Sequence, residues 1–179
     1  EQALADRIDE ALDVLATLQH DDGLIDLPSC NFHSPPDAGF MVEDLAVLCE
    51  VLTDSYEASP LRDRLLERLA AVISAACDGM VGAGVHTPNH RWKVASALTL
   101  ADRLWPNESW RREARAWLAE GIDIDADDEF TEQSTGGYNL VCDQAMVLLG
   151  RAMGEPGYLH IADRNLRHML WLLHADGTL

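Results

Sequence analysis

Positive charge is scarce in this sequence. Lysine and arginine together number 13, against 31 aspartate and glutamate residues, and the formal net charge is −18. Surfaces that bind nucleic acid or anionic membranes carry clustered basic side chains, because phosphate groups attract cations. The charge therefore excludes both classes of partner, and any anionic ligand needs a local positive site. The only lysine is Lys93.

Long apolar runs are also missing, since none approaches the ~20 residues that span a bilayer. Apolar residues still make up 47% of the 179 residues, which is enough for a core. This length predicts a single domain over residues 1–179, or a piece of a larger protein. Glu1–Leu4 do not form the basic-then-apolar pattern of a signal peptide, so we expect a soluble globular chain that carries no targeting segment; the compartment stays open.

Several motifs that define common chemistries are absent. There is no C-x-x-C pair, so the four cysteines are expected to be free thiols and not disulfides: Cys30, Cys49, Cys77 and Cys142. There is no phosphate-binding glycine loop, no G-x-S-x-G elbow and no H-E-x-x-H helix. These absences disfavour the common nucleotide-dependent and protease activities.

Helical periodicity dominates what is present. Apolar residues at Leu4, Ile8, Leu12, Leu15 and Leu18 form a helical stripe, and the same period recurs along the chain. No stretch alternates convincingly as a β-strand. The sequence predicts an all-α fold without a β-sheet, with seven helices at 2–19, 37–54, 60–77, 89–105, 107–120, 136–153 and 156–174.

The connections between these helices alternate in length. Short links join the second helix to the third, the fourth to the fifth and the sixth to the seventh, which predicts three antiparallel hairpins. Links of roughly 11–17 residues join the pairs and are expected to emerge on one rim. Helices 89–105 and 136–153 are apolar nearly all round and are predicted to lie inside, whereas 60–77 and 107–120 keep one polar face for solvent.

A weak repeat agrees with this layout. Acidic turn pairs recur at intervals of 56, 49 and 49 residues: Asp22-Gly23, Asp78-Gly79, Asp127-Asp128 and Asp176-Gly177. Helical hairpins at this period indicate an α/α solenoid or toroid. The alternative is that Asp-Gly pairs are simply common in turns. Seven helices cannot close a ring of six hairpins, so we expect an incomplete, truncated toroid.

Three polar loops lead into helices expected to be buried, over residues 26–36, 85–92 and 129–139. Helix N-termini expose unpaired N–H groups and partial positive charge, so such a rim would attract anions. The polar and aromatic side chains of these loops are therefore candidate ligand-binding residues: Asn31, His33, His86, Arg91, Trp92 and Asn139.

Asn89, His90 and Tyr138 are the candidate catalytic residues. Each has a structural alternative, since Asn89 fits an N-cap and a tyrosine after two glycines fits a packed phenol. A free phenol is a poor base at neutral pH, but a nearby cation would favour the phenolate, and His90 and Arg91 are the candidates. Pro88 interrupts the spacing of His86 and His90 that a helical zinc pair needs, so no metal site is predicted.

The stretches His86–Trp92 and Ser134–Asn139, joined by Trp117–Asp123, resemble the helical domain of heparinase II/III-like proteins, which are relatives of the α/α-toroid alginate lyases. The resemblance implies a polysaccharide lyase that cleaves uronic-acid polymers by β-elimination without a cofactor. It also implies that Asn89 and His90 neutralise the uronate carboxylate and that Tyr138 moves a proton. Proton abstraction builds negative charge on that carboxylate, so fixed donors lower the barrier.

Two other functions stay open. A glycoside hydrolase on a related toroid needs two carboxyl groups beside the scissile bond, and the candidates are Asp26, Asp37, Asp44, Glu132 and Asp143. A non-catalytic carbohydrate-binding or scaffold module is the third hypothesis, because a fold does not determine a function. The family resemblance implies a further C-terminal β-sandwich domain. An acidic polysaccharide or oligosaccharide is the expected partner, and the sequence also allows an oligomer.

Overall fold

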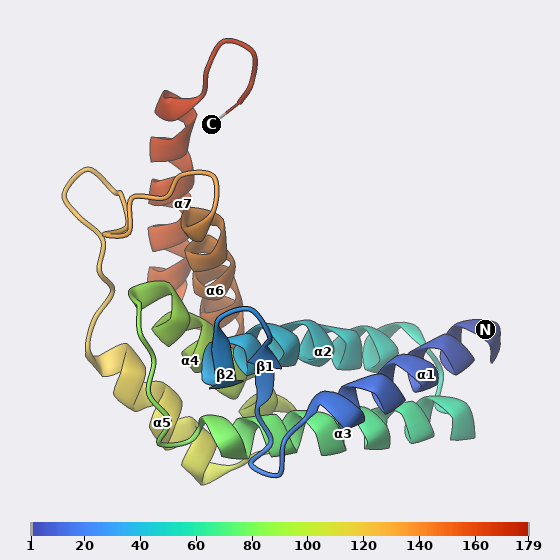
Figure 1. Cartoon of the computed structure of the whole chain (residues 1–179). Helices are drawn as coiled ribbons and strands as arrows, with labels where there is room; N and C mark the ends of the chain where they lie inside the picture. The colour runs from blue at the N-terminus through green and yellow to red at the C-terminus, as the bar shows by residue number, and fades with distance from the viewer. Residues whose placement is uncertain (1, 179) are drawn as a thin grey trace.

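The structure is a computed structural model that describes residues 2–178. Within these residues the chain forms seven helices and one small sheet of two antiparallel strands (Figure 1). In chain order the elements are α1 (Gln2–Leu18), β1 (Ile25–Leu27), β2 (Asn31–Ser34), α2 (Pro35–Ser55), α3 (Pro60–Met80), α4 (Pro88–Leu104), α5 (Glu108–Ala119), α6 (Tyr138–Met153) and α7 (Pro156–Leu172).

The seven predicted helices are confirmed, with ends that shift by at most a few residues. Proline occupies the first turn of α2, α3, α4 and α7, where its fixed φ suits a helix and its missing N–H costs nothing. Side chains of Ser34, Ser59 and Asn107 cap the starts of α2, α3 and α5. Breakers and caps in the sequence therefore locate the helix starts.

The expectation of a chain without any β-sheet was wrong. Strands β1 and β2 form a hairpin in the connection that precedes α2. They are only three and four residues long, so no alternating pattern is visible in the sequence. The hairpin is held locally: the backbone N–H of His33 donates to Asp26 Oδ1 over 2.7 Å, and the His33 ring stacks on His20 with centroids 4.0 Å apart.

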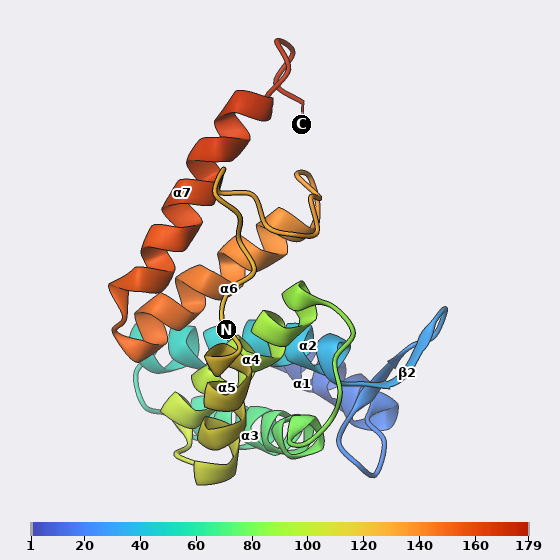
Figure 2. The ribbon, with the colours of Figure 1, turned by 90° about the vertical axis from the view of Figure 1, so that its left-hand side faces the viewer.

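The helices are arranged as three hairpins whose first members adjoin one another. The pairs α2/α3, α4/α5 and α6/α7 pack together, and α4 lies between α2 and α6. As predicted, α4 is buried along most of its length, whereas α3 and α5 keep an exposed face. The same prediction for α6 holds only in part, because α6 has an exposed side that includes Leu140 and Arg151. Helix α1 packs on α3, and the α6/α7 hairpin stands away from the α1–α3 part of the molecule (Figures 1 and 2).

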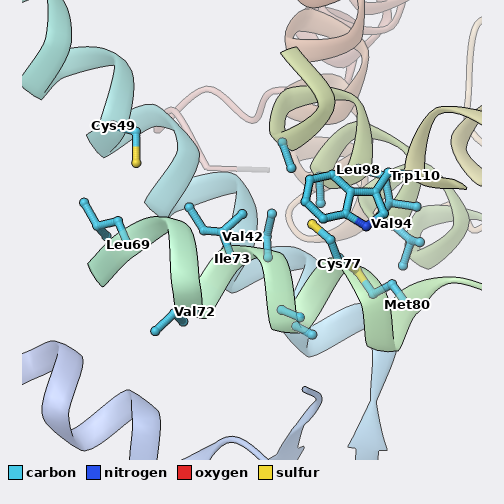
Figure 3. Packing of buried hydrophobic residues seen from close by; sticks show 14 of the residues in the cluster. Val42, Cys49, Leu69, Val72, Ile73, Cys77, Met80, Val94, Leu98 and Trp110 are labelled. Carbon is cyan, nitrogen blue, oxygen red and sulfur yellow. The ribbon is translucent and has the colours of Figure 1, made fainter. Parts of the chain in front are cut away.

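Two apolar clusters hold this arrangement. The large core joins α1 to α5 and includes Val42, Leu69, Ile73 and Leu98 (Figure 3). The small core joins the Trp92 side of α4 to α6, α7 and the loop before α6. All four cysteines are free thiols, as predicted; Cys30 is exposed and the other three are buried.

One turn geometry recurs in three places along the chain. Residues 20–24, 125–129 and 174–178 each close with a bond from the first residue's N–H to the fifth residue's carbonyl. Each also has a bond from the fourth residue's N–H back to the first carbonyl, and the fourth residue has positive φ in all three: Gly23, Asp128 and Gly177. Three of the four predicted repeat positions therefore share one backbone structure. Asp78-Gly79 differs, because it lies inside the last turn of α3.

Lys93 is fully buried. Its ammonium pairs with the Glu43 carboxylate across the α2/α4 contact, and the Ser96 hydroxyl donates to the same carboxylate. The only lysine therefore supports the packing of two inner helices. It offers no positive charge to a ligand. Among residues 2–178, none of the helices combines the length and apolar character that a membrane span requires.

Candidate functional site

The starts of α2, α4 and α6 lie on the same side of the molecule (Figure 2). The connections 19–34, 81–87 and 120–137 lead into these starts. The link before α4 is shorter than the predicted 11–17 residues, because α3 continues to Met80. We call this side the rim. The N-terminal end of a helix carries partial positive charge, which favours ligands with negative or electron-rich atoms.

His90 lies at the rim, on the first turn of α4. Burial lowers the pKa of its imidazole, while the negative charges of Asp37 and Glu132 act in the opposite direction. Asp37 belongs to the first turn of α2 and Glu132 to the loop before α6, so His90 feels charges from both neighbouring elements. Its Nδ1 is buried without a hydrogen-bond partner among the described residues. A neutral imidazole is a competent proton acceptor, but because Nδ1 is buried a substrate has to reach the ring through its other nitrogen.

Asn89 ties two of the rim segments together. Its side chain is only 2% exposed, and Nδ2 donates to both carboxylate oxygens of Glu132 over 2.7 Å and to Thr87 Oγ1 over 3.0 Å. The amide hydrogens of Asn89 are therefore already engaged. A substrate carboxylate would have to displace Glu132 to reach them.

Tyr138 is the first residue of α6 and is 51% exposed. Its backbone N–H lies 3.4 Å from the Ser134 hydroxyl, which bonds the start of the helix to the preceding loop. That loop is the segment whose Glu132 bonds Asn89. Tyr138 and His90 therefore belong to two helix starts that one loop joins, and the phenol ring is accessible from solvent.

Two predicted binding residues are inaccessible. Trp92 is fully buried and packs against Phe130, with ring centroids 5.4 Å apart in the small core. Asn139 is also fully buried, and its Nδ2 donates to Glu129 Oε1 over 3.0 Å. Both residues stabilise the arrangement beneath the rim, and a ligand at the rim cannot contact either one here.

Two others belong to the β1/β2 hairpin. Asn31 donates to Ser34 Oγ over 2.7 Å, and His33 Nδ1 lies 2.6 Å from Asp22 Oδ2. His33 has a positive φ of 48°, which suits the turn back toward α2. These interactions hold the hairpin, which projects to one side of the rim (Figure 2).

His86 and Arg91 line a common pocket of about 200 Å³ beside His90. The wall also includes Trp117 and Glu120 from the end of α5. Arg91 Nη1 bonds Glu120 over 2.7 Å, Nη2 bonds the Gly121 carbonyl over 3.3 Å, and the guanidinium also pairs with Asp123.

Two donors in this wall are unused. The Nε of Arg91 and the Nε1 of Trp117 are buried without hydrogen-bond partners among residues 2–178. Both atoms are buried, so what the pocket offers a ligand is the side chains of Trp117 and Arg91 that line it. An aromatic side chain beside a guanidinium suits a ligand with an apolar face and acceptor oxygens, as a sugar ring has.

Sequence reasoning missed several residues of this site. Trp117 was not among the predicted binding residues, although its position near the end of α5 places it beside the connection to α6. Glu132 and Asp37 were considered only as carboxyl groups for hydrolysis, and their proximity to His90 depends on the packing of α2, α4 and the loop before α6. Residues 2–178 contain no group of three or more histidine, cysteine or acidic side chains arranged to hold a metal ion.

Comparisons of this chain with known protein families, with curated proteins and with solved structures found no match. The functional argument therefore rests on the geometry of the rim and its pocket.

Proposed function

We propose that this chain is the helical domain of a polysaccharide lyase that cleaves uronic-acid-containing polysaccharide by β-elimination. The observation that supports this most is the pair of Asn89–Glu132 hydrogen bonds, which join the turn bearing His90 to the loop leading into Tyr138. The pocket lined by Arg91 and Trp117 adjoins the same turn and provides a sugar subsite.

In this proposal His90 is the base. Its lowered pKa leaves the imidazole neutral at neutral pH, so it can accept the proton on the carbon next to the uronate carboxylate. The electrons of that C–H bond form a carbon–carbon double bond as the neighbouring C–O bond breaks, and the leaving oxygen takes a proton from Tyr138. Asp37 and Glu132 stabilise the imidazolium that forms on His90.

Arg91 provides the positive charge for substrate binding. Its guanidinium is shared with Glu120 and Asp123, which neutralise much of its charge; its Nε has no partner but is buried, so it donates to a ligand only after the side chain shifts. We propose that a uronate ring stacks on Trp117 while an acceptor oxygen bonds this Nε. The acidic side chains around the pocket favour a short oligosaccharide or a sparsely charged polymer over a densely sulfated one.

The proposed architecture is an open portion of an α/α toroid. The support is the order of the hairpins, with α2, α4 and α6 as neighbouring inner helices, and the three turns that share one backbone geometry. Stacked repeats present their loops on one side, which is where binding surfaces of such proteins form.

The test is a turnover assay on a panel of polyuronates, in which unsaturated uronate is detected by its ultraviolet absorbance. His90→Gln and Tyr138→Phe should each lower kcat by about 10²–10⁴-fold, the contribution of a positioned acid or base. His160→Gln, an exposed histidine on α7, is the matched control and should keep the wild-type rate. Wild-type turnover by both site variants would contradict the assigned roles.

A glycoside hydrolase is the second candidate, because Asp37 and Glu132 act on His90 from two different elements. Hydrolysis yields new reducing ends without a double bond, so one reaction mixture distinguishes the two chemistries. Asp37→Asn and Glu132→Gln should then abolish reducing-end formation. Saturable calorimetric binding of uronate oligosaccharides with neither product would instead identify a non-catalytic binding module, and Trp117→Ala should weaken that binding.

A further inference from the structure

The β1/β2 hairpin leads directly into the start of α2, which lies at the rim. Ser34 is the last residue of β2 and caps α2, and it is fully buried. Its hydroxyl donates to Asp37 Oδ2 and accepts from the Asp37 backbone N–H over 3.3 Å. Asn31, at the start of β2, donates from Nδ2 to the same hydroxyl over 2.7 Å. One hydroxyl group therefore joins the hairpin to the first turn of α2.

The chemistry of these three side chains fixes the direction of their hydrogen bonds. An amide NH2 group can only donate and a carboxylate can only accept, whereas a hydroxyl does both. Because Asn31 donates to the Ser34 oxygen, the Ser34 hydrogen is left for the Asp37 carboxylate. The Asp37 backbone N–H takes the remaining acceptor position of the hydroxyl. A buried hydroxyl that is fully satisfied in this way holds its partners in one geometry.

The contact between Asn31 and Ser34 depends on a bend in β2. Residues three apart in a straight strand point to opposite faces of the sheet. His33 lies between them with a positive φ of 48°, which is uncommon for a residue other than glycine. Its N–H donates to Asp26 over 2.7 Å and its ring stacks on His20, so the surrounding structure holds the bend in place. We attribute the meeting of the two side chains to this bend.

Asp37 lies close to the turn that carries His90. The starts of α2 and α4 pack tightly, since a Cβ at Gly39 would lie 3.5 Å from the carbonyl carbon and oxygen of Lys93. Asp37 precedes Gly39 by two residues, and His90 precedes Lys93 by three. Both side chains are therefore displaced from this contact in the same direction, toward the rim.

The charge of Asp37 matters for His90. Burial lowers the pKa of the imidazole most strongly, and Asp37 is the charged group with the largest effect, which raises that pKa. Glu132, in the loop before α6, also raises the pKa, and His86, in the loop before α4, lowers it. Because Asp37 is only half-buried, its carboxylate could turn into solvent if no donor held it.

We infer that Ser34 and Asn31 are positioning residues, which hold the Asp37 carboxylate where it stabilises the positive charge that His90 acquires. The inference rests on the proposed function, in which His90 is the base. It gives the β1/β2 hairpin a task in the same site, since the hairpin supplies the donors that fix a carboxylate beside the base. Asn31 then acts through Ser34 and Asp37 and does not touch the substrate.

The test is an NMR titration of the His90 ring in the full chain, with its signals assigned by comparison with His90→Gln. Asp37→Asn removes the charge and should lower the pKa of His90 by about one pH unit. Ser34→Ala and Asn31→Ala should lower it by a smaller amount, because Asp37 keeps its charge and loses its fixed position. Ser34→Thr keeps the hydroxyl and should keep the wild-type pKa.

Matched variants separate this effect from a general loss of structure. Ser59→Ala removes the equivalent cap of α3, so it should destabilise the chain about as much as Ser34→Ala and leave the pKa of His90 unchanged. Asn31→Ala leaves the cap of α2 intact, and its control is Phe32→Ala at the neighbouring exposed position. An unchanged or raised pKa of His90 in either Ser34→Ala or Asn31→Ala overturns the inference.

Turnover of polyuronates separates this inference from the proposed function. If His90 is the base, Asn31→Ala should move the acidic limb of the kcat/KM profile to lower pH by the same amount as the ring titration. A wild-type pH profile in an active Asn31→Ala variant contradicts the inference alone. The expected changes in the pKa of His90, found in a protein without any turnover, support the positioning of Asp37 and contradict the proposed function.

Discussion

The α1–α5 region and the α6/α7 hairpin are both helical, but they bury different kinds of side chain. The large core in the first region joins five helices around residues such as Ile73 and Leu98. The small core in the second region depends on a few apolar side chains and on a loop, with Phe130 inserted against Trp92. Helix α4 belongs to both cores, so it couples the two regions.

Their buried polar groups differ as well. In the α1–α5 region Glu43 is neutralised by Lys93 and accepts from Ser96. In the α6/α7 region both carboxylate oxygens of Asp143 and the Oδ1 of Asn165 are buried without hydrogen-bond partners among the described residues. Unpaired buried acceptors cost stability and are common near functional sites. The α1–α5 region also has unpaired buried groups, on His90, Arg91, Trp92 and Trp117, but its buried carboxylate is paired with a cation and Asp143 is not. We therefore expect the buried carboxyl group of Asp143 to make the second region, which carries Tyr138, easier to open.

The largest effect is expected from breaking the buried pair. Lys93→Met leaves the Glu43 carboxylate buried without its cation and should lower the free energy of unfolding by about 3–5 kcal/mol, measured by urea denaturation. The control is the double variant Glu43→Leu with Lys93→Met, which removes both charges and should recover most of the loss. Equal loss in the single and double variants would show that the pair itself is not the cause.

Cavities of the same kind in the two cores should show whether the two regions open independently. Leu98→Ala and Leu149→Ala each remove a fully buried leucine side chain and should each cost about 2–5 kcal/mol. We expect Leu98→Ala to accelerate amide hydrogen exchange throughout the chain. Leu149→Ala should accelerate exchange mainly in α6 and α7 while α2 and α3 stay protected. The same exchange pattern for both variants would mean that the chain opens as one unit.

Asp143 should make the α6/α7 region sensitive to pH. Burial, together with the charge of Glu129, raises the pKa of this carboxyl to about 7, from about 3.9 in an unfolded chain. The folded state therefore holds the proton more tightly. The contribution of Asp143 to the free energy of unfolding is therefore fully present below about pH 4, and it is lost as the pH rises through 7.

The asparagine in the Asp143→Asn variant cannot ionise, so this variant should not lose stability as the pH rises. Thermal and urea unfolding at pH 8 should show the variant about 2–4 kcal/mol more stable than the wild type, with the difference vanishing toward pH 4. Glu43, whose pKa burial also raises, is unchanged in both proteins and serves as the common background. A stability difference that does not vary with pH would contradict the assignment.

The smallest effect is expected from two glycines at close contacts. A Cβ at Gly79 would lie 2.3 Å from the backbone oxygen of Asp22, whereas a Cβ at Gly150 would lie 2.7 Å from the side-chain Cγ of Leu159. Backbone cannot move aside as a leucine side chain can. Both substitutions should lower the free energy of unfolding in urea by about 1–3 kcal/mol. The loss should be larger for Gly79→Ala than for Gly150→Ala. The reverse order would show that the α6/α7 contact is the more rigid one.

Much of the fold could be predicted from the sequence. Prolines at the helix starts and the apolar period of residues such as Leu4, Ile8 and Leu12 predict the helices within a few residues. Loop lengths predict the three hairpins, because a short link leaves no choice but an antiparallel neighbour. The β1/β2 hairpin was missed, since strands this short carry no periodic signal and depend on the His20–His33 stack and on Asp26.

The candidate site was only partly predictable. His90, His86 and Arg91 were found because polar side chains before a buried helix stand out in the sequence. The burial of Trp92 and Asn139 could not be read there, because an aromatic or amide side chain at a helix start looks the same whether it faces solvent or a core. The environment of His90 depends on Asp37 and Glu132, which are distant in sequence.

The sequence by itself determined which segments are helical, which of them pair, and that one side of the molecule would collect the long polar loops. These properties follow from local backbone preferences and from apolar periodicity, which act within a few residues. Only the tertiary structure decided that the lone lysine is buried against Glu43, that Glu132 holds Asn89, and that Trp117 joins Arg91 in a pocket. Such contacts depend on how whole helices pack, and no local pattern encodes them.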